Sequence, residues 1–450
     1  MKLSLVYPVS FLLKLIFFFF YSLVLAAQEN PLPDIDSRLE KVIRINRLKA
    51  LKKAHQAPRE LSRLGSMLFH EVELSGTRDI NCASCHHPRF GTADAQAFSI
   101  GQGGSGLGTS RIQRSGGLTR RHSPHLLNLG YPEITHMFWD GRVARNPQTG
   151  AFTTPEPALN GANPTRADIT SVLKSSLSAQ TIFPIANALE MRGEFGNDVA
   201  DAQGNLGAWD AVMKRLLFGP KGNEYLEQFR KAYPKNSRPG VFNIGHVGEA
   251  LGSFLRTAFN VIDTPYDRYL NGDKTAMTNS EKKGLEVFAG RGKCIKCHNG
   301  DHLSNFEFKT VGTPQLTPAE YPAPFDRGRF EVTQKKSDLF KFKTPALRNL
   351  SITAPYMHNG VFNSLEKVIE HYDNPKESLA SFSLSNASID LSNYSSSFVI
   401  DRDETRNKLR INLISIGDVR RGLNLTPSEK ADLLSFLKTG LLDYRFQGNR

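Results

Sequence analysis

Apolar residues recur at helical spacing in two short stretches, and each stretch lies shortly before a pair of cysteines. The first covers residues 64–69 (Leu-Gly-Ser-Met-Leu-Phe) and the second covers residues 283–288 (Lys-Gly-Leu-Glu-Val-Phe). Both predict a short helix with one apolar face, and residues 278–281 (Thr-Asn-Ser-Glu) give the second a capping-box start. Strand-like alternation is scarce. The pattern therefore predicts a mostly α-helical protein with long irregular loops.

The N-terminus has the pattern of a secretory signal. Lys2 opens a weakly basic region, residues 15–25 are apolar, and residues 24–27 offer small-residue cleavage sites. We therefore expect residues 1–27 to be a signal peptide. No later stretch is long and apolar, so we expect no stable membrane span in the mature form.

The two cysteine pairs share one spacing, Cys-x-x-Cys-His, at Cys82, Cys85 and His86 and again at Cys294, Cys297 and His298. This spacing attaches a c-type haem through two thioether bonds, and the adjacent histidine is placed to ligate the iron. These are the only four cysteines in the chain. The sequence thus predicts two covalently bound haem c groups and, with an export signal, a periplasmic protein.

Zinc binding and disulfide formation are two other possible roles of the cysteines, and each explains the sequence pattern less well than haem attachment does. Zinc-binding pairs usually lie about 12 to 20 residues apart, whereas these pairs are more than 200 residues apart. Disulfides in an exported chain would leave both trailing histidines unexplained.

The length of the chain indicates how many domains it has, and its net charge indicates what kind of partner it binds. A chain of 450 residues allows two domains, and the turn-rich stretch 260–278 is the expected boundary. We expect a cytochrome-c-like domain with one haem in each of residues 28–265 and 275–450. Losing Lys2 and Lys14 with the signal lowers the net charge from +13 to +11, which favours an acidic protein partner. No clustered basic stripe indicates nucleic acid.

Residues 101–108 form a glycine-rich stretch. A phosphate-binding loop needs a strand before it and a helix after it, and neither is predicted here. We therefore expect a mobile loop at this position.

Four further segments, together with the haem motifs, resemble the bacterial di-haem cytochrome c peroxidase and MauG family. The segments are residues 138–142 (Phe-Trp-Asp-Gly-Arg), 179–191, 342–349 (Phe-Lys-Thr-Pro-Ala-Leu-Arg-Asn) and 353–360 (Thr-Ala-Pro-Tyr-Met-His-Asn-Gly). They occur in the family's order. Among MauG-like proteins, the amino-acid sequence of residues 74–94 is most similar to that of the MbnH branch.

The resemblance implies a peroxide-reactive haem in the N-terminal domain. It places Glu190 beside that haem as the group that moves the peroxide proton, with Gln180 and Pro184 in the same pocket. It places Trp139 between the two haems as an electron relay. Without the resemblance, Glu190 would be an ordinary surface glutamate and Trp139 a core residue.

The residue opposite His298 divides the family. The peroxidases place a methionine there, whereas MauG-like enzymes place a tyrosine, and this chain has Tyr372 at the matching position. An anionic phenolate stabilises ferric and higher oxidation states, and a thioether favours ferrous iron. His371 is adjacent and is an alternative ligand, and a surface tyrosine is the other alternative.

The ligands of the first haem also differ between members of the family. Peroxidases that need reductive activation have a displaceable histidine on a loop, but no histidine occurs between His87 and His122. We expect His86 alone to ligate this iron, with His122 or His125 as alternatives. The family also holds calcium through backbone oxygens, here those of Thr353 and Pro355, although His122 replaces an asparagine ligand and suits a hard cation poorly.

These features predict a periplasmic oxidoreductase that uses hydrogen peroxide to form a high-valent di-haem state and then oxidises a side chain of a partner protein. The alternative is a cytochrome c peroxidase that reduces peroxide to water with electrons from a small cytochrome or copper protein. A non-enzymatic di-haem electron carrier is a third possibility.

Overall fold

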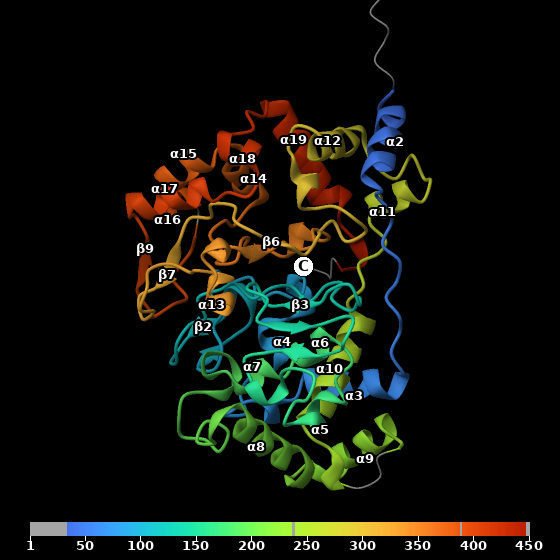
Figure 1. Ribbon diagram of the computed structural model, residues 1–450, viewed down its shortest axis with the longest axis vertical. Coiled ribbons are helices and arrows are strands. Elements are labelled where there is room, and N and C mark those ends of the chain that lie inside the picture. The colour runs from blue at the N-terminus through green and yellow to red at the C-terminus, as the bar shows by residue number, and fades with distance from the viewer. Residues whose placement is uncertain (1–33, 236–238, 388, 447–450) are drawn as a thin grey trace, which may run out of the picture.

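A computed structural model describes residues 34–235, 239–387 and 389–446. The chain folds into two mostly helical halves, one above the other, with short strands and loops between them (Figure 1). The predicted signal peptide lies outside the described residues. None of the helices in the described ranges combines a bilayer-crossing length with a sufficiently apolar sequence.

The N-terminal half, drawn in blue to green, holds eight α-helices and five short strands in the described residues. Its helices are α3 (Arg59–Phe69), α4 (Cys82–Cys85), α5 (Ala167–Thr170), α6 (Ser176–Gln180), α7 (Phe183–Ala186), α8 (Gly204–Phe218), α9 (Gly222–Ala232) and α10 (Ile244–Ala258). Its strands are β1 (Gly104–Ser105), β2 (Ile112–Gln113), β3 (His136–Met137), β4 (Val143–Arg145) and β5 (Phe152–Thr153). Strands β1 and β2 pair antiparallel, as do β3, β4 and β5 in that order.

The C-terminal half, drawn in yellow to red, is built in the same way. Its helices are α11 (Pro265–Leu270), α12 (Asn279–Ala289), α13 (Phe330–Thr333), α14 (Leu365–Asp373), α15 (Pro375–Ala380), α16 (Leu384–Ala387), α17 (Glu404–Asn412), α18 (Gly417–Arg421) and α19 (Pro427–Ser435). Its strands are β6 (Phe308–Lys309), β7 (Leu316–Pro318), β8 (Phe342–Lys343) and β9 (Phe398–Ile400). Here β6 pairs with β8 and β7 pairs with β9. The predicted predominance of helix is confirmed.

The two predicted helices are α3 and α12, and each packs closely on the last long helix of its half. A Cβ atom on Gly65 of α3 would lie 1.9 Å from the carbonyl oxygen of Ala250 in α10, and one on Gly284 of α12 would lie 2.1 Å from that of Asp432 in α19. Only glycine permits such approaches. The capping box at the start of α12 is also confirmed, with Thr278 and Glu281 bonded reciprocally. The two halves thus repeat one packing device.

The N-terminal segment does not stay with the N-terminal half. Helix α2 (Ile35–Asn46) lies beside α11 and α12, and the chain then descends to α3 (Figure 1). Lys282 donates to Asp36 at 2.9 Å, and Leu39 is fully buried in the core of the C-terminal half. The sequence-based division at residues 265–275 remains a prediction, and residues 35–48 lie outside the half to which it assigns them.

Four hydrophobic clusters organise the cores of the described residues. One lies within the N-terminal half, and a second and a small fourth, which contains Ile411 and Val419, lie within the C-terminal half. The third joins Phe98, Ile100 and Leu118 to Val361 and Phe382, and therefore crosses between the halves. Burial of this apolar surface holds the two haem motifs in a fixed relation across the junction.

Candidate functional site

A single cavity of about 910 Å³ runs through the junction of the two halves. The predicted haem-attachment, catalytic and ligand residues line it, apart from the alternative ligand His371: Cys82, Cys85, His86, Trp139, Gln180, Pro184, Glu190, Cys294, Cys297, His298, Thr353, Pro355 and Tyr372. They come from segments separated by up to 290 positions in the chain. The fold thus assembles the predicted site around one cavity.

The first Cys-x-x-Cys-His motif forms the short helix α4 and the residue after it. Nδ1 of His86 lies 2.9 Å from the carbonyl oxygen of Thr92, which fixes the proton on Nδ1 and leaves Nε2 as the free ligand atom. Burial lowers the pKa of His86 to about 4, so the imidazole is neutral. Burial also raises the pKa values of Cys82 and Cys85 to about 12.

The second motif repeats this geometry. Cys294 begins the 3₁₀ turn η7 (Cys294–Lys296), and Nδ1 of His298 lies 3.1 Å from the carbonyl oxygen of Leu303. Burial lowers the pKa of His298 to about 4 and raises that of Cys294 to about 12. Both motifs therefore offer two thiols and an oriented neutral imidazole to the cavity, which is the donor set that a c-type haem requires.

No disulfide joins any two of the four cysteines. Within the described part of the chain, no three His, Cys, Asp or Glu side chains gather as a metal-binding group, so the two pairs do not form a shared zinc site. Both alternatives to haem attachment therefore lack structural support.

Gln180, Pro184 and Glu190 come from consecutive turns on one wall of the cavity. Gln180 ends α6, Pro184 lies in the first turn of α7, and Glu190 lies in the π-helical turn η5 (Ala188–Arg192). Burial raises the pKa of Glu190 above its ordinary value, and the positive charge of Arg142 opposes this rise. Sequence reasoning missed Asn187, whose side-chain Nδ2 donates to Oε1 of Glu190 at 3.1 Å.

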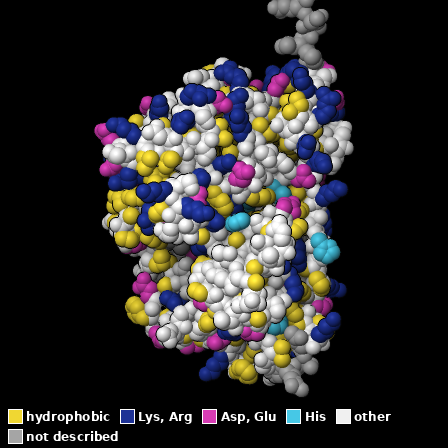
Figure 2. Space-filling view, viewed as in Figure 1, with side chains coloured by type: hydrophobic (Ala, Val, Ile, Leu, Met, Phe, Trp, Pro, Cys, Tyr) yellow, Lys and Arg dark blue, Asp and Glu magenta, His cyan; other side chains and the backbone are white. Residues whose placement is uncertain are grey.

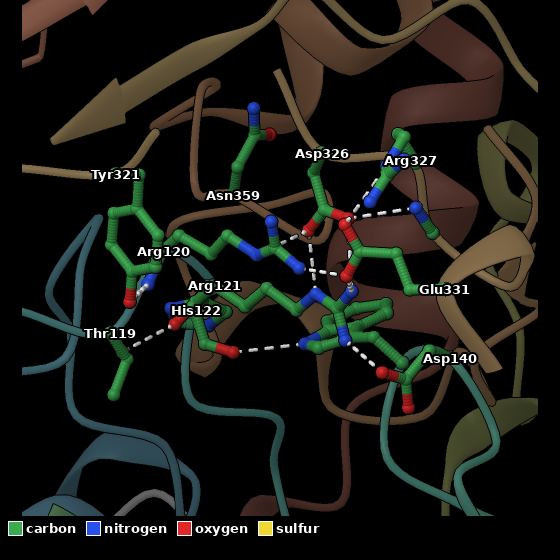
Figure 3. A network of polar contacts seen from close by, with 12 residues as sticks. Thr119, Arg120, Arg121, His122, Asp140, Tyr321, Asp326, Arg327, Glu331 and Asn359 are labelled. Atoms are coloured by element: carbon green, nitrogen blue, oxygen red, sulfur yellow. Dashed lines mark hydrogen bonds and ion pairs between the residues drawn. The ribbon is translucent and has the colours of Figure 1, made fainter. Parts of the chain in front are cut away.

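Trp139 is held from both halves. Its indole Nε1 donates to the carbonyl oxygen of His122 at 2.9 Å, and its own carbonyl accepts from the backbone N–H of Lys343 at 2.8 Å. Figure 3 shows the ion network beside it, in which Arg121 from the N-terminal half lies between Asp326 and Asp140. Although burial opposes ionisation, Arg121 keeps the pKa of Asp326 well below its ordinary value. This network fixes the Trp139 segment across the junction.

Tyr372 and His371 are adjacent in α14 but face different surroundings. Both ring nitrogens of the fully buried His371 are engaged, Nδ1 with the Ser378 hydroxyl and Nε2 with the Val311 carbonyl, each at 2.9 Å. Tyr372 instead lines the cavity, where burial and the nearby sulfurs of Cys297 and Cys294 raise the pKa of its hydroxyl. Of the two residues, only Tyr372 is directed at the second motif.

His122 and His125, the alternative ligands for the first site, differ as well. Nδ1 of His122 lies 2.8 Å from the Gln96 carbonyl. His125 lines the cavity, burial lowers its pKa to about 4, and its buried Nδ1 has no hydrogen-bond partner among the described residues. Calcium binding through Thr353 and Pro355 stays a prediction, and the ring of His122, whose Nδ1 is bonded to the Gln96 carbonyl, provides no oxygen ligand.

Lys343 is a second residue that sequence reasoning missed, although it lies within the recognised 342–349 segment. Its side chain lines the cavity and donates to the carbonyl oxygen of His136 at 2.9 Å. Burial lowers the pKa of Lys343 to about 8. It therefore brings a buried cation to the space between the motifs.

Comparison with known proteins gives a consistent result. A family model described as di-haem cytochrome c peroxidase matches residues 59–275. Cytochrome c551 peroxidase of Pseudomonas aeruginosa is 30% identical over 298 residues, which cover 66% of this chain and 67% of that protein. The methylamine utilization protein MauG of Methylorubrum extorquens is 28% identical over 320 residues, which cover 71% and 70% of the two chains.

The fold is also similar to that of a solved structure. A crystal structure of a MauG-like protein associated with microbial copper homeostasis aligns with a TM-score of 0.59 and 24% identity, covering 89% of this chain and 95% of that one. At this identity the likeness establishes the architecture alone. It extends over both halves of the molecule.

Proposed function

The chain belongs to the di-haem cytochrome c peroxidase family and is a peroxide-dependent di-haem enzyme, and we propose that it directs the oxidising power of peroxide to a side chain of a separate protein. The proposal rests on one observation, namely that Tyr372 and not His371 is available as a ligand at the second site. Tyr372 faces the cavity beside Cys294 and Cys297, and both nitrogens of His371 are bonded elsewhere.

A tyrosine at this position suits an oxidase better than an electron-receiving peroxidase. Burial keeps the hydroxyl of Tyr372 protonated unless a positive charge lies beside it. A metal ion beside Tyr372 would supply that positive charge, and the hydroxyl would lose its proton. The resulting phenolate favours the more oxidised states of a metal, whereas a thioether favours the reduced state. Met357, the methionine nearest to Tyr372 in the sequence, also lines the cavity, but it packs against the cluster between the halves that contains Phe98 and Val361.

When bound, the two haems supply the redox chemistry, namely cleavage of the peroxide O–O bond and storage of its two oxidising equivalents. The protein supplies the proton transfer. Glu190 lines the wall shared with Gln180 and Pro184, and a carboxylate there can take the proton from one peroxide oxygen and return it to the other. Its burial places the pKa nearer to neutrality than that of an exposed glutamate, which suits both steps.

Trp139 is proposed to carry electrons between the two sites. Its indole lines the same cavity as both motifs and is fixed by the bond from Nε1 to the His122 carbonyl. A rigid aromatic ring changes little in geometry when it gains or loses an electron, so the fixed indole favours fast transfer. Arg121 in the network of Figure 3 is bonded to Asp140, the residue after Trp139.

The partner is proposed to be an acidic protein met in the periplasm. The sequence carries a net charge of +13, and Figure 2 shows lysine and arginine side chains scattered over one face, more of them on the upper half. Distributed positive charge steers an acidic protein toward the surface without selecting nucleic acid.

One observation favours the alternative, a cytochrome c peroxidase supplied by a small redox protein. His125 lines the cavity and keeps an unpaired buried nitrogen, as a displaceable ligand of the first iron would. Steady-state peroxide consumption with a reduced small c-type cytochrome separates the two functions. We expect negligible turnover above the rate without protein, and sustained turnover would establish the alternative instead.

A further inference from the structure

The side chain of Asn187 binds two groups with its two ends. Its Oδ1 accepts from the backbone N–H of Leu189 at 2.9 Å, and its Nδ2 donates to Oε1 of Glu190 at 3.1 Å. A backbone N–H can only donate, so the amide oxygen must face Leu189. The amide NH₂ must then face the Glu190 carboxylate, and the orientation of Asn187 is set by its partners.

The backbone that carries Glu190 is held just as closely. The N–H of Gln102 donates to the carbonyl oxygen of Glu190 at 2.8 Å, and the N–H of Gly76 donates to that of Met191 at 2.7 Å. Gly101 lies so near that a Cβ atom there would be 2.5 Å from the same Glu190 oxygen. The turn η5 cannot move without disturbing these contacts.

The glycine-rich stretch that makes these contacts is itself fixed. Arg111 is buried, and its guanidinium donates to the carbonyl oxygens of Ile100 and Gly101 at 2.7 Å and of Gly106 at 3.1 Å. Expected from sequence to be a mobile loop, this segment instead clamps the turn that bears Glu190. The carboxylate therefore has one remaining freedom, the rotation of its own side chain, and Asn187 restricts that rotation.

We propose that Asn187 is a positioning residue that holds Oε1 of Glu190 and leaves Oε2 to take and return the peroxide proton. This inference rests on the proton-carrying role proposed above for Glu190. A proton on Oε1 would face the amide hydrogens of Asn187, whereas no described residue donates to Oε2. The amide thus selects the oxygen that acts and aims it into the cavity.

The charges around Glu190 are few. Arg142, in the loop after β3, is the charged group that acts on it, and Cys85 of α4 lies within its field. Arg111 of the glycine-rich stretch is committed to three carbonyl groups. A new carboxylate at position 187 would therefore meet Glu190 directly, with only Arg142 to offset the repulsion.

The experiment measures the rate of the peroxide reaction against pH in haem-loaded protein carrying Asn187→Asp or Asn187→Ser. Both residues can accept from Leu189 as Asn187 does, so a role limited to capping the turn would leave rate and pH profile unchanged. In Asn187→Asp we expect the pH of half-maximal rate to rise, because a carboxylate replaces the donor to Glu190. In Asn187→Ser we expect a loss of about tenfold with a smaller rise, because a hydrogen bond to a charged group disappears.

Asn146→Asp is the matched control. The side chain of Asn146 also accepts from backbone N–H groups, those of Gln148 and Thr149, and it contacts neither the turn η5 nor a carboxylate among the described residues, so its pH profile should equal that of the wild type. An unchanged profile in both Asn187 variants would overturn the inference. If Glu190→Gln itself reacted with peroxide at the wild-type rate, the proposed role of Glu190 would fail instead, and the two failures are thus distinct.

Discussion

Each haem-attachment region has two sides: the Cys-x-x-Cys-His segment with the helix before it, and the cavity wall around that segment. The two regions share the first side and differ in the second, which we call the shared and the unshared side. In each, a glycine-containing helix packs on the last long helix of its half, a Cys-x-x-Cys-His turn follows, and the histidine Nδ1 is bonded to a backbone carbonyl five or six residues later. One part of the cavity wall carries Gln180, Pro184 and Glu190, and Glu190 interacts electrostatically with Cys85 of the first motif, whereas Tyr372 interacts with the cysteines of the second motif.

This difference indicates what sets the function of each site. The shared side attaches and orients the cofactor, and it would serve an electron carrier equally well. In the function proposed here, Glu190 carries a proton at one site and Tyr372 serves as a ligand at the other, and this difference would separate a peroxide-reacting site from a site that stores charge. Substitutions on the unshared side should therefore change chemistry, and those on the shared side should change stability.

The largest expected effect is that of Glu190→Gln. The amide cannot take up or return a proton, so the rate of peroxide reaction should fall by about 10²- to 10⁴-fold. Stopped-flow mixing of haem-loaded protein with peroxide measures this rate. Glu194→Gln, four residues later and exposed, should react as the wild type does. An equal loss in both variants would contradict a specific role for Glu190.

Tyr372→Met makes the second site resemble that of a peroxidase. Replacing an anionic oxygen ligand by a thioether should raise the reduction potential of that haem by on the order of 100 mV or more, within the span of about 0.8 V that axial ligands cover. Spectroelectrochemical titration measures the potential, and the reaction with peroxide should then require prior reduction. Tyr444→Met, at an exposed position, is the control. An unchanged potential in Tyr372→Met would remove Tyr372 from the ligand set.

The smallest expected effects are the losses of stability caused by Gly65→Ala and Gly284→Ala. Each methyl group would meet a backbone carbonyl of the partner helix at about 2 Å, and such overpacking costs on the order of 1–3 kcal/mol in the free energy of unfolding. We expect similar losses in the two variants, measured by thermal unfolding of the haem-loaded protein. Gly240→Ala, with nothing within 4 Å of its new methyl group, should have little effect.

Local sequence signals predicted the shared side well. The helices before each motif and the capping box of Thr278 and Glu281 follow from spacing and chemistry within a few residues. The resemblance to a family also selected Gln180, Pro184, Glu190 and Tyr372, which line the cavity, because the family's motifs mark them individually.

Long-range contacts could not be predicted in this way. The amide of Asn187 reaches Glu190 only because the turn η5 is π-helical and is clamped by Gly76 and Gln102 from distant segments. The placement of α2 against α12 likewise depends on partners more than 200 positions away, such as Lys282 for Asp36. Such contacts leave no periodic pattern in the sequence.

The most direct test of the central claim is the reaction of the purified diferric protein with one equivalent of hydrogen peroxide and no reductant, followed by visible and near-infrared spectroscopy. The account predicts that both haems change rapidly from their resting absorption and that the change persists, because Tyr372 supports oxidation of the second site. A protein that does not react until one haem has been reduced would contradict the account and would establish peroxide removal as its function.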